Sequence, residues 1–216
     1  MAIESVKAKQ TERTRRRIRS AALRLFNRRG TTQVHTHDIA RAASISPGNL
    51  YYHYKNKEEI IREIVLGIPI YDGLEWERAV LPLGPADFRG FLESFFKGLG
   101  RHRFFFREFS ILVRKDEKLG ASWRSTFVGL ERALEGAARH WVKVGMLRPF
   151  PRREDLDAFV HNAWILLHSC ESFLEVESGT SGRTIHEGAV KLVLSFLTPY
   201  HTDAGQKEIR RFLNGK

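Results

Sequence analysis

The chain has 216 residues, of which 42% are hydrophobic, so it can bury the core of one large domain or of two small ones. It contains no run of the ~18 consecutive apolar residues that a membrane span needs, and no apolar stretch follows the basic N-terminus as it would in a secretory signal. A single cysteine, Cys170, excludes an internal disulfide and a multi-cysteine zinc site, and together these features predict a soluble, cytoplasmic protein without a membrane partner.

The basic charge is concentrated at the N-terminal end of the chain. Residues 1–60 contain 13 Lys and Arg against 5 Asp and Glu, a net charge of +8, whereas residues 61–216 contain 23 against 20, a net charge of +3. Attraction to phosphates supplies most of the non-specific affinity of proteins for DNA. The distribution favours a DNA-binding domain joined to a second domain of balanced charge, over the alternative of a solvated basic face.

The first predicted elements are a flexible basic arm over residues 1–11 and a helix over residues 12–29. The helix has one apolar face and ends at Gly30, a residue type that often follows the last turn of a helix. The residues of that face are Ile18, Ala22, Leu25 and Phe26. The arginines Arg13, Arg15, Arg16 and Arg17 can reach phosphates or the minor groove, although we expect at least two of them to be ordinary solubilising charges.

Residues 34–57 have the pattern of a helix-turn-helix. The first helix has apolar residues at helical spacing, the turn is Ser44-Ile45-Ser46, and Pro47 suits the first position of the second helix. Leu50 and Tyr54 lie four residues apart and can face inward. The outward positions hold Asn49, Tyr51, Tyr52 and His53. Such groups exchange hydrogen bonds with phosphates and base edges, which indicates a helix that lies in the DNA major groove.

This segment resembles the N-terminal domain of the TetR family of bacterial transcription regulators. The family pattern is a first helix ending in Phe and Gly, an Ile-Ala pair, Leu-Tyr-x-His-aromatic and Lys-Glu-Glu. The chain has these as Leu25–Gly30, Asp38–Ala40, Leu50–Tyr54 and Lys57–Ile60, in order and without gaps over about residues 12–62. The resemblance implies an all-α protein with a DNA-binding domain over residues 12–58, a regulatory and dimerisation domain over residues 59–200, and a tail or short helix over residues 201–216.

The resemblance also implies the residues that contact double-stranded operator DNA. It assigns Pro47, Gly48, Asn49 and Tyr52 to base or groove contacts. It assigns Tyr51, His53 and Lys57 to phosphate contacts, although Tyr51 is as easily interpreted as a core aromatic. His35 departs from the pattern, because the family usually has Ser or Thr there as an N-cap. Either His35 caps poorly or Thr36 takes over the cap, and Thr36 and His37 then become further contact candidates.

The rest of the chain is predicted to be helical. Asn56 can cap a helix that stops or kinks at Gly67 and Pro69, and a break follows at residues 81–85. Apolar residues at helical spacing predict further helices over about residues 85–99, 102–113, 121–144, 154–176 and 184–197, and a last one over 206–213. No strand pattern or repeat accompanies them, and the fold class is all-α.

Fourteen of the fifteen phenylalanines follow residue 60, and aromatic stripes of this kind are usually the core of a helical bundle. The resemblance implies that the bundle also contains a cavity for an effector. The candidate lining residues are Phe95, Phe96, Phe105, Phe109, Trp141 and Trp164. After residue 60 the only amide side chains are Asn162, Asn214 and Gln206, so a hydrophobic effector fits better than a sugar. A fatty acid or acyl-CoA is one candidate, with its acidic head near Arg101, Arg103 or Arg107.

No catalytic motif is present, and no cofactor or metal is expected. His161 and His168 lie seven residues apart on one helix, about 10.5 Å at a rise of ~1.5 Å per residue, too far to share a metal ion. The sequence therefore predicts a homodimeric repressor that a hydrophobic ligand releases from a palindromic operator. The helices over 154–176 and 184–197 are expected to form the dimer interface, through the stripe Val190, Val193, Leu194 and Leu197. The alternatives are a ligand-independent DNA-organising protein and a helical enzyme with a basic head.

Overall fold

The computed structural model describes residues 2–68 and 85–207, and over these residues the protein is all-α, as predicted. Within them there is no strand, and the single isolated β-bridge pairs Leu147 with His201. No helix in the described part of the chain is both long and apolar enough to cross a membrane. Residues 81–84 of the predicted break and residues 208–213 of the predicted last helix lie outside the described residues.

The described residues form two compact units, which we treat separately. The first unit contains residues 2–68 and 102–121, and the second contains residues 85–101 and 122–207. The helices in chain order are α1 (Ala2–Arg29), α2 (Thr36–Ala42), α3 (Pro47–His53), α4 (Lys57–Leu66), α6 (Pro85–Arg101), α7 (Arg103–Lys115), α8 (Glu117–Lys143), α9 (Arg153–Ser178) and α10 (Arg183–Leu197), followed by the short 3-10 helix η2 (Thr198–Tyr200). The first turn of α8 belongs to the first unit.

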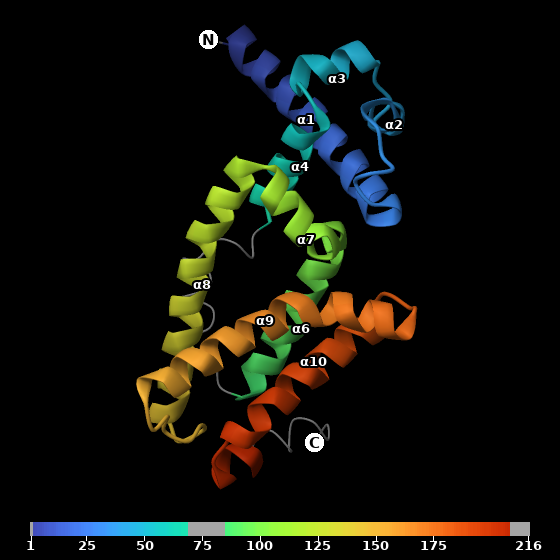
Figure 1. The fold of residues 1–216 in the computed structure, drawn as a ribbon. Coiled ribbons are helices and arrows are strands. Elements are labelled where there is room, and N and C mark those ends of the chain that lie inside the picture. Colours follow the sequence, from blue (N-terminus) through green and yellow to red (C-terminus); the bar gives the residue numbers. More distant parts are fainter. Residues whose placement is uncertain (1, 69–84, 208–216) are drawn as a thin grey trace. The chain divides into compact units, whose positions relative to one another are not determined.

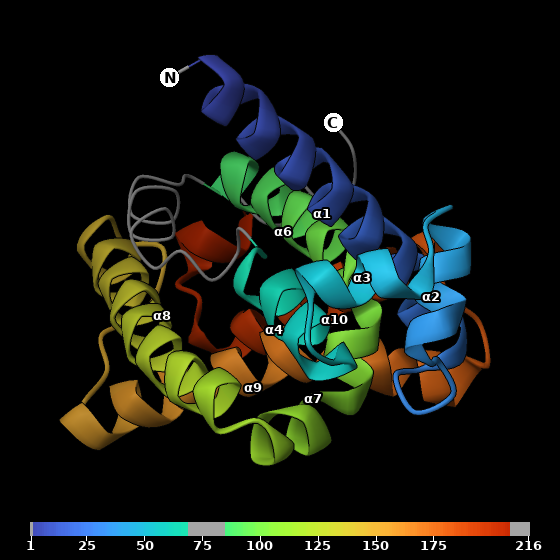
Figure 2. The same ribbon diagram turned by 90° about the horizontal axis from the view of Figure 1, so that it is seen from above.

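Helix α1 is longer than the sequence suggested. It begins at Ala2, whereas we predicted a flexible arm up to residue 11. The helix extends this far because residues 2–17 contain no Gly or Pro and are rich in strong helix formers. It ends at Gly30 as predicted, and Gly30 has the left-handed φ of +76° that favours glycine. Helices α2 and α3 lie against α1 in both views (Figures 1 and 2).

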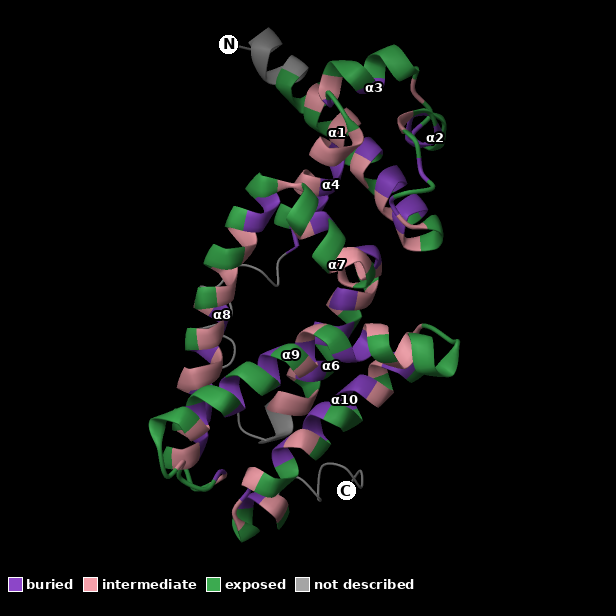
Figure 3. Ribbon diagram, in the orientation of Figure 1, coloured by how far each residue is buried: buried purple, intermediate pink, exposed green. Residues whose placement is uncertain are grey.

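The core of the first unit joins these helices. The predicted inner face of α1 is buried, with Ile18 and Ala22 fully inaccessible. It packs with the buried apolar residues of α2, α3 and α4, which form the purple inner surfaces in Figure 3. These contacts hold the two short helices, since helices of seven residues are too short to be stable in isolation.

Helix α7 is part of the first unit, although no pattern in the sequence predicted this. Its Phe104 ring lies 5.3 Å from the ring of Phe26, and the Phe104 N–H donates to Asn27 Oδ1 over 3.1 Å. Glu108 accepts hydrogen bonds from the Thr31 N–H, over 2.9 Å, and from the Thr31 hydroxyl. These contacts fasten α7 to the end of α1 and to the loop before α2.

A second connection links α4 to the junction of α7 and α8. Arg62 and Asp116 form an ion pair of 2.7 Å, and Asp116 also accepts from the Leu119 N–H at the start of α8. Burial opposes ionisation of Asp116, but the hydrogen bonds from Arg62 and from the Leu119 N–H, together with the charge of Arg62, outweigh burial, and the pKa of the Asp116 carboxyl is lowered. The ionised pair therefore stabilises the first unit.

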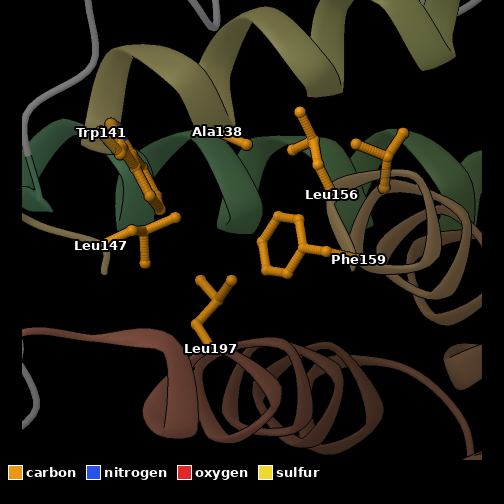
Figure 4. Close-up of a cluster of buried hydrophobic side chains, with 7 residues drawn as sticks. Ala138, Trp141, Leu147, Leu156, Phe159 and Leu197 are labelled. Carbon is orange, nitrogen blue, oxygen red and sulfur yellow. The ribbon is translucent and has the colours of Figure 1, made fainter. Parts of the chain in front are cut away.

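In the second unit α10 packs along α9 and against α6. Figure 4 shows the part of its core where α8, α9 and α10 meet, with Trp141 and Ala138 on α8, Leu156 and Phe159 on α9, and Leu197 on α10. Leu147, from the segment between α8 and α9, also belongs to this cluster, and Val160 of α9 completes it. One of the predicted ligand residues, Trp141, is thus a core residue of the protomer.

The predicted dimer stripe on α10 was wrong. Val190, Val193, Leu194 and Leu197 are buried inside the protomer, at 6% exposure or less. The apolar period of a helix indicates that a face is covered, but it does not say whether the same chain or a second copy covers it. The large apolar side chains that are exposed on the last two helices are Ile165, Phe173 and Val176 of α9 and Leu192 of α10.

Candidate nucleic-acid interface

The turn between α2 and α3 is held by an arginine of α1. Arg17 donates to the carbonyl oxygens of Ala43, over 2.6 Å, and of Ser44, over 3.2 Å. Ser44 has a φ of +53°, an uncommon conformation for a residue other than glycine, and these bonds lie directly at it. Ser46 then caps α3 by accepting from the Asn49 N–H, and Pro47 takes the first helical position as predicted.

The other end of α3 is held by a second arginine of α1. Arg15 donates to the His53 carbonyl oxygen over 3.1 Å, and its guanidinium lies over the Tyr54 ring, 4.5 Å from the centroid. Arg15 and Arg19 both pair with Glu63 of α4. Of the four arginines considered for DNA contact, Arg17 therefore holds the turn before α3 and Arg15 holds the end of α3. Arg13 and Arg16 remain exposed.

The charges around Glu63 stabilise its ionised form. Burial alone would raise the pKa of the Glu63 carboxyl. The hydrogen bonds that Glu63 accepts from Arg15, Tyr54 and Arg19 together outweigh burial, and the pKa is lowered. Burial raises the pKa of Tyr54 to about 12, so its hydroxyl stays neutral at physiological pH. The cluster joins α1, α3 and α4 and fixes the orientation of α3.

The side chains of α3 divide as the sequence predicted. Leu50 is fully buried and Tyr54, which follows the helix, is 2% exposed, whereas Tyr51 is 52% and Tyr52 is 73% exposed. Pro47, Gly48 and Asn49 are also exposed, and His53 is half-buried. A Cβ at Gly48 would have no other atom within 4 Å, so the backbone there is open to a partner. The helix presents a continuous polar surface.

The start of α2 lies beside this surface. The Thr36 and Tyr51 hydroxyls are hydrogen-bonded at 2.8 Å, which joins α2 to α3. His35 is the N-cap residue of α2 and Thr36 is the first residue of the helix, so Thr36 does not take over the cap. The hydrogen bond from the His35 N–H lowers the pKa of Asp38. The exposed ring of His37 stacks on that of His35, with centroids 5.6 Å apart.

Lys57 has a structural role that no local sequence pattern predicted. Its ammonium donates to the carbonyl oxygens of Thr31, over 2.6 Å, and of Val34, over 2.9 Å. Thr31 and Val34 are buried. Lys57 thereby clamps the loop before α2 to the first turn of α4, and two of its three N–H groups are used inside the protein.

The six predicted ligand residues are divided between the two units. Phe105 and Phe109 lie in the first unit, where their rings contact each other at 5.5 Å. In the second unit the rings of Phe95 and Phe96 are 5.2 Å apart, and Trp164 lies among Trp123, Phe127 and His168. Five of the six are buried, and Phe109 is half-buried. Among the described residues no three His, Cys, Asp or Glu side chains gather to hold a metal ion.

Two family models match the chain. The model described as "Bacterial regulatory proteins, tetR family" matches residues 18–64, and the model described as "Bacterial transcriptional repressor" matches residues 78–209. Similar curated proteins include AcrR of Shigella flexneri, 39% identical over 55 residues, and UidR of Escherichia coli K12, 37% identical over 57 residues. Each match covers 26% of this chain, and it spans only 26% and 29% of the lengths of AcrR and UidR.

Solved structures extend the similarity over most of the chain. A TetR-family regulator of Marinobacter aquaeolei is 28% identical with a TM-score of 0.76, covering 92% of this chain and 96% of that one. The repressor SmeT of Stenotrophomonas maltophilia has the same fold at 23% identity and a TM-score of 0.59, covering 88% and 91%. The family match over residues 78–209 exceeds half of the chain. The protein therefore belongs to the TetR family of bacterial transcriptional regulators, which are not enzymes.

Proposed function

We propose that the protein is a dimeric, ligand-responsive repressor that binds a palindromic operator through α3. The observation that carries this proposal is the exposed polar surface of α3, a helix held by arginines of α1 at the turn before it and at its last residue. A rigidly held helix positions hydrogen-bonding groups for base readout without further ordering. In this proposal the protein acts in the cytoplasm, where operator DNA is present.

The proposed base and groove contacts are Pro47, Gly48, Asn49 and Tyr52. The proposed phosphate contacts are Thr36, Tyr51 and His53, with His37 beside them. Lys57 remains a candidate phosphate contact through its third N–H, in addition to its clamp on the loop before α2. Arg13 and Arg16 are exposed on α1 and can add phosphate contacts.

For the dimer we propose the exposed face of α9, extended by Leu192 of α10. Ile165, Phe173 and Val176 are 49%, 64% and 84% exposed, and they follow one another by eight and three residues, so they lie on one side of the helix. Ser169, also exposed, lies between Ile165 and Phe173 and allows a partner helix to approach closely. A two-fold contact of α9 and α10 with their copies would cover this face and place two α3 helices for two half-sites.

For the effector we propose a hydrophobic molecule that binds in the second unit, with fatty acids or acyl-CoAs among the candidates. The aromatic residues Phe95, Phe96, Trp141 and Trp164 all belong to that unit. The acidic head would have to be bound elsewhere than at Arg103 and Arg107, because both donate to the Asn27 carbonyl. Helix α6 is separated from α7 by His102 alone, so a shift of α6 would pull on α7 and on the end of α1. Such coupling would require tighter effector binding to the form that releases DNA.

The test is a gel-shift series on an operator selected from random DNA. The proposal expects one enriched palindrome, bound much more tightly than random DNA, and release by long-chain fatty acids or acyl-CoAs but not by sugars. Equal affinity for all sequences would favour the ligand-independent DNA-organising alternative. Release by a sugar, with no response to any hydrophobic compound, would contradict the proposed effector class.

A further inference from the structure

Two histidine rings lie one upon the other at the start of α2. His35 is the N-cap residue of the helix, and His37 is its second residue. Their rings stack with centroids 5.6 Å apart and planes within 5° of parallel. Both residues are exposed, and the His37 side chain keeps 66% of its surface accessible. We call His35 and His37 the histidine pair.

Thr36 places the histidine pair beside α3. Its hydroxyl, from the residue between the two histidines, is hydrogen-bonded to the Tyr51 hydroxyl at 2.8 Å. Tyr51 belongs to the exposed polar surface of α3 that we propose for operator binding. In a helix-turn-helix the second helix lies in the major groove while the first crosses the DNA backbone. A bound operator therefore brings phosphates to the start of α2.

The charges around the histidine pair in the free protein are mostly positive. Asp38 Oδ1 lies 3.4 Å from His37 Nε2, but it lies 2.9 Å from Arg41 Nη2, whose charge does not titrate. Arg29 of α1 also acts on Asp38. Lys57 of α4 donates to the carbonyl oxygen that precedes the pair in the chain. The charged groups that these contacts place near the pair are three cations and one carboxylate, which together oppose an added proton.

We propose that the histidine pair takes up a proton when the protein binds operator DNA, so that affinity rises as the pH falls from 8 to 6. Histidine is the side chain whose charge ordinarily changes in this range. A phosphate oxygen accepts a hydrogen bond from an imidazolium and stabilises its charge. Two imidazolium rings 5.6 Å apart repel each other, so we expect about one proton for each pair and two for a dimer. The inference rests on the proposed function, since that function places α2 at the DNA backbone.

His53, the other histidine beside the exposed surface of α3, is less suited to this role. It is half-buried, and burial, followed by the charge of Arg15, lowers its pKa. His53 is therefore neutral over most of the range from pH 6 to pH 8. Variants of the histidine pair decide between the two positions, because they leave His53 in place.

The experiment measures the affinity of the full-length protein for the selected operator by fluorescence anisotropy at pH 6, 7 and 8 and at one ionic strength. Uptake of about one proton for each pair predicts affinity at least about tenfold weaker at pH 8 than at pH 6. Calorimetric titration in two buffers of different ionisation enthalpy counts the protons directly. The double variant His35→Asn with His37→Asn should lose most of the pH dependence and of the proton uptake. Asparagine is a favoured N-cap, so the start of α2 should still form.

The matched control is His140→Asn, which removes a half-buried histidine from α8 in the second unit. It should keep the pH dependence and the proton uptake of the wild type, and a circular dichroism melt checks that each variant is folded. Equal affinity at pH 6 and pH 8, or unchanged proton uptake in the folded double variant, overturns the proposal. The proton count is repeated on random DNA at low salt, because its phosphates are the same. Loss of sequence preference therefore refutes the proposed function, whereas the proton count still tests this inference.

Discussion

Lys57 offers a test of whether a residue at the DNA surface acts mainly on DNA or mainly on the fold. Lys57→Met keeps most of the side-chain length and removes the ammonium that donates to Thr31 and Val34. A hydrogen bond to a charged group contributes about 1.5–3 kcal/mol when buried, and Lys57 is only half-buried, so we expect a loss of about 2 kcal/mol for the two bonds together. For a chain of this size that corresponds to a fall in Tm of roughly 4–8 °C.

The assay is urea unfolding and thermal melting at one fixed protein concentration, with the salt dependence of operator affinity measured in parallel. The matched control is Lys55→Met, which removes the same charge from an exposed side chain two residues away. Loss of one phosphate contact makes the negative slope of log affinity against log salt shallower by about 0.9 for each DNA-binding domain of the dimer. If Lys57→Met keeps the stability of the wild type and its operator affinity depends less steeply on salt, Lys57 does not stabilise the loop before α2. Lys57 would then be a phosphate contact alone.

Three further predictions concern recognition, assembly and pH. Asn49→Ala and Tyr52→Ala should each weaken binding to the selected operator by ~1–3 kcal/mol and binding to random DNA much less, as measured by competitive gel shift. If both variants keep the sequence preference of the wild type, other residues read the bases. Phe173→Glu should give folded monomers in analytical ultracentrifugation, whereas Val193→Glu should lower the melting temperature because Val193 is buried in the protomer. If Phe173→Glu remains dimeric, the interface lies on another surface of the protein. The lowered pKa of Glu63 gives stability that is present above the unfolded-state pKa of about 4.3 and is lost as pH falls through the folded-state pKa. In thermal melts between pH 7 and 3, Glu63→Gln should reduce the fall in melting temperature at acidic pH. An unchanged fall would show that Glu63 is not its source.

Local sequence signals determined the helix-turn-helix. The inward positions Leu50 and Tyr54, the cap of α3 and the glycine that ends α1 all depend on residues within about one helical turn of each other. Helical periodicity and capping act over that range, and the fold class and the outward surface of α3 followed from them. The start of α1 was misplaced because a charged, helix-favouring segment without Gly or Pro was interpreted as an arm.

Only the tertiary structure decided the contacts between residues that lie far apart in the chain. The partners of Arg17 lie more than twenty residues away, those of Lys57 likewise, and Glu108 reaches Thr31 from 77 positions downstream. No local pattern distinguishes these side chains from solvated charges. The stripe of α10 shows the same limit for apolar residues, since Val193 packs within its own chain and Phe173 does not. Periodicity specifies that a face is buried, but its partner is chosen by the packing of the whole chain.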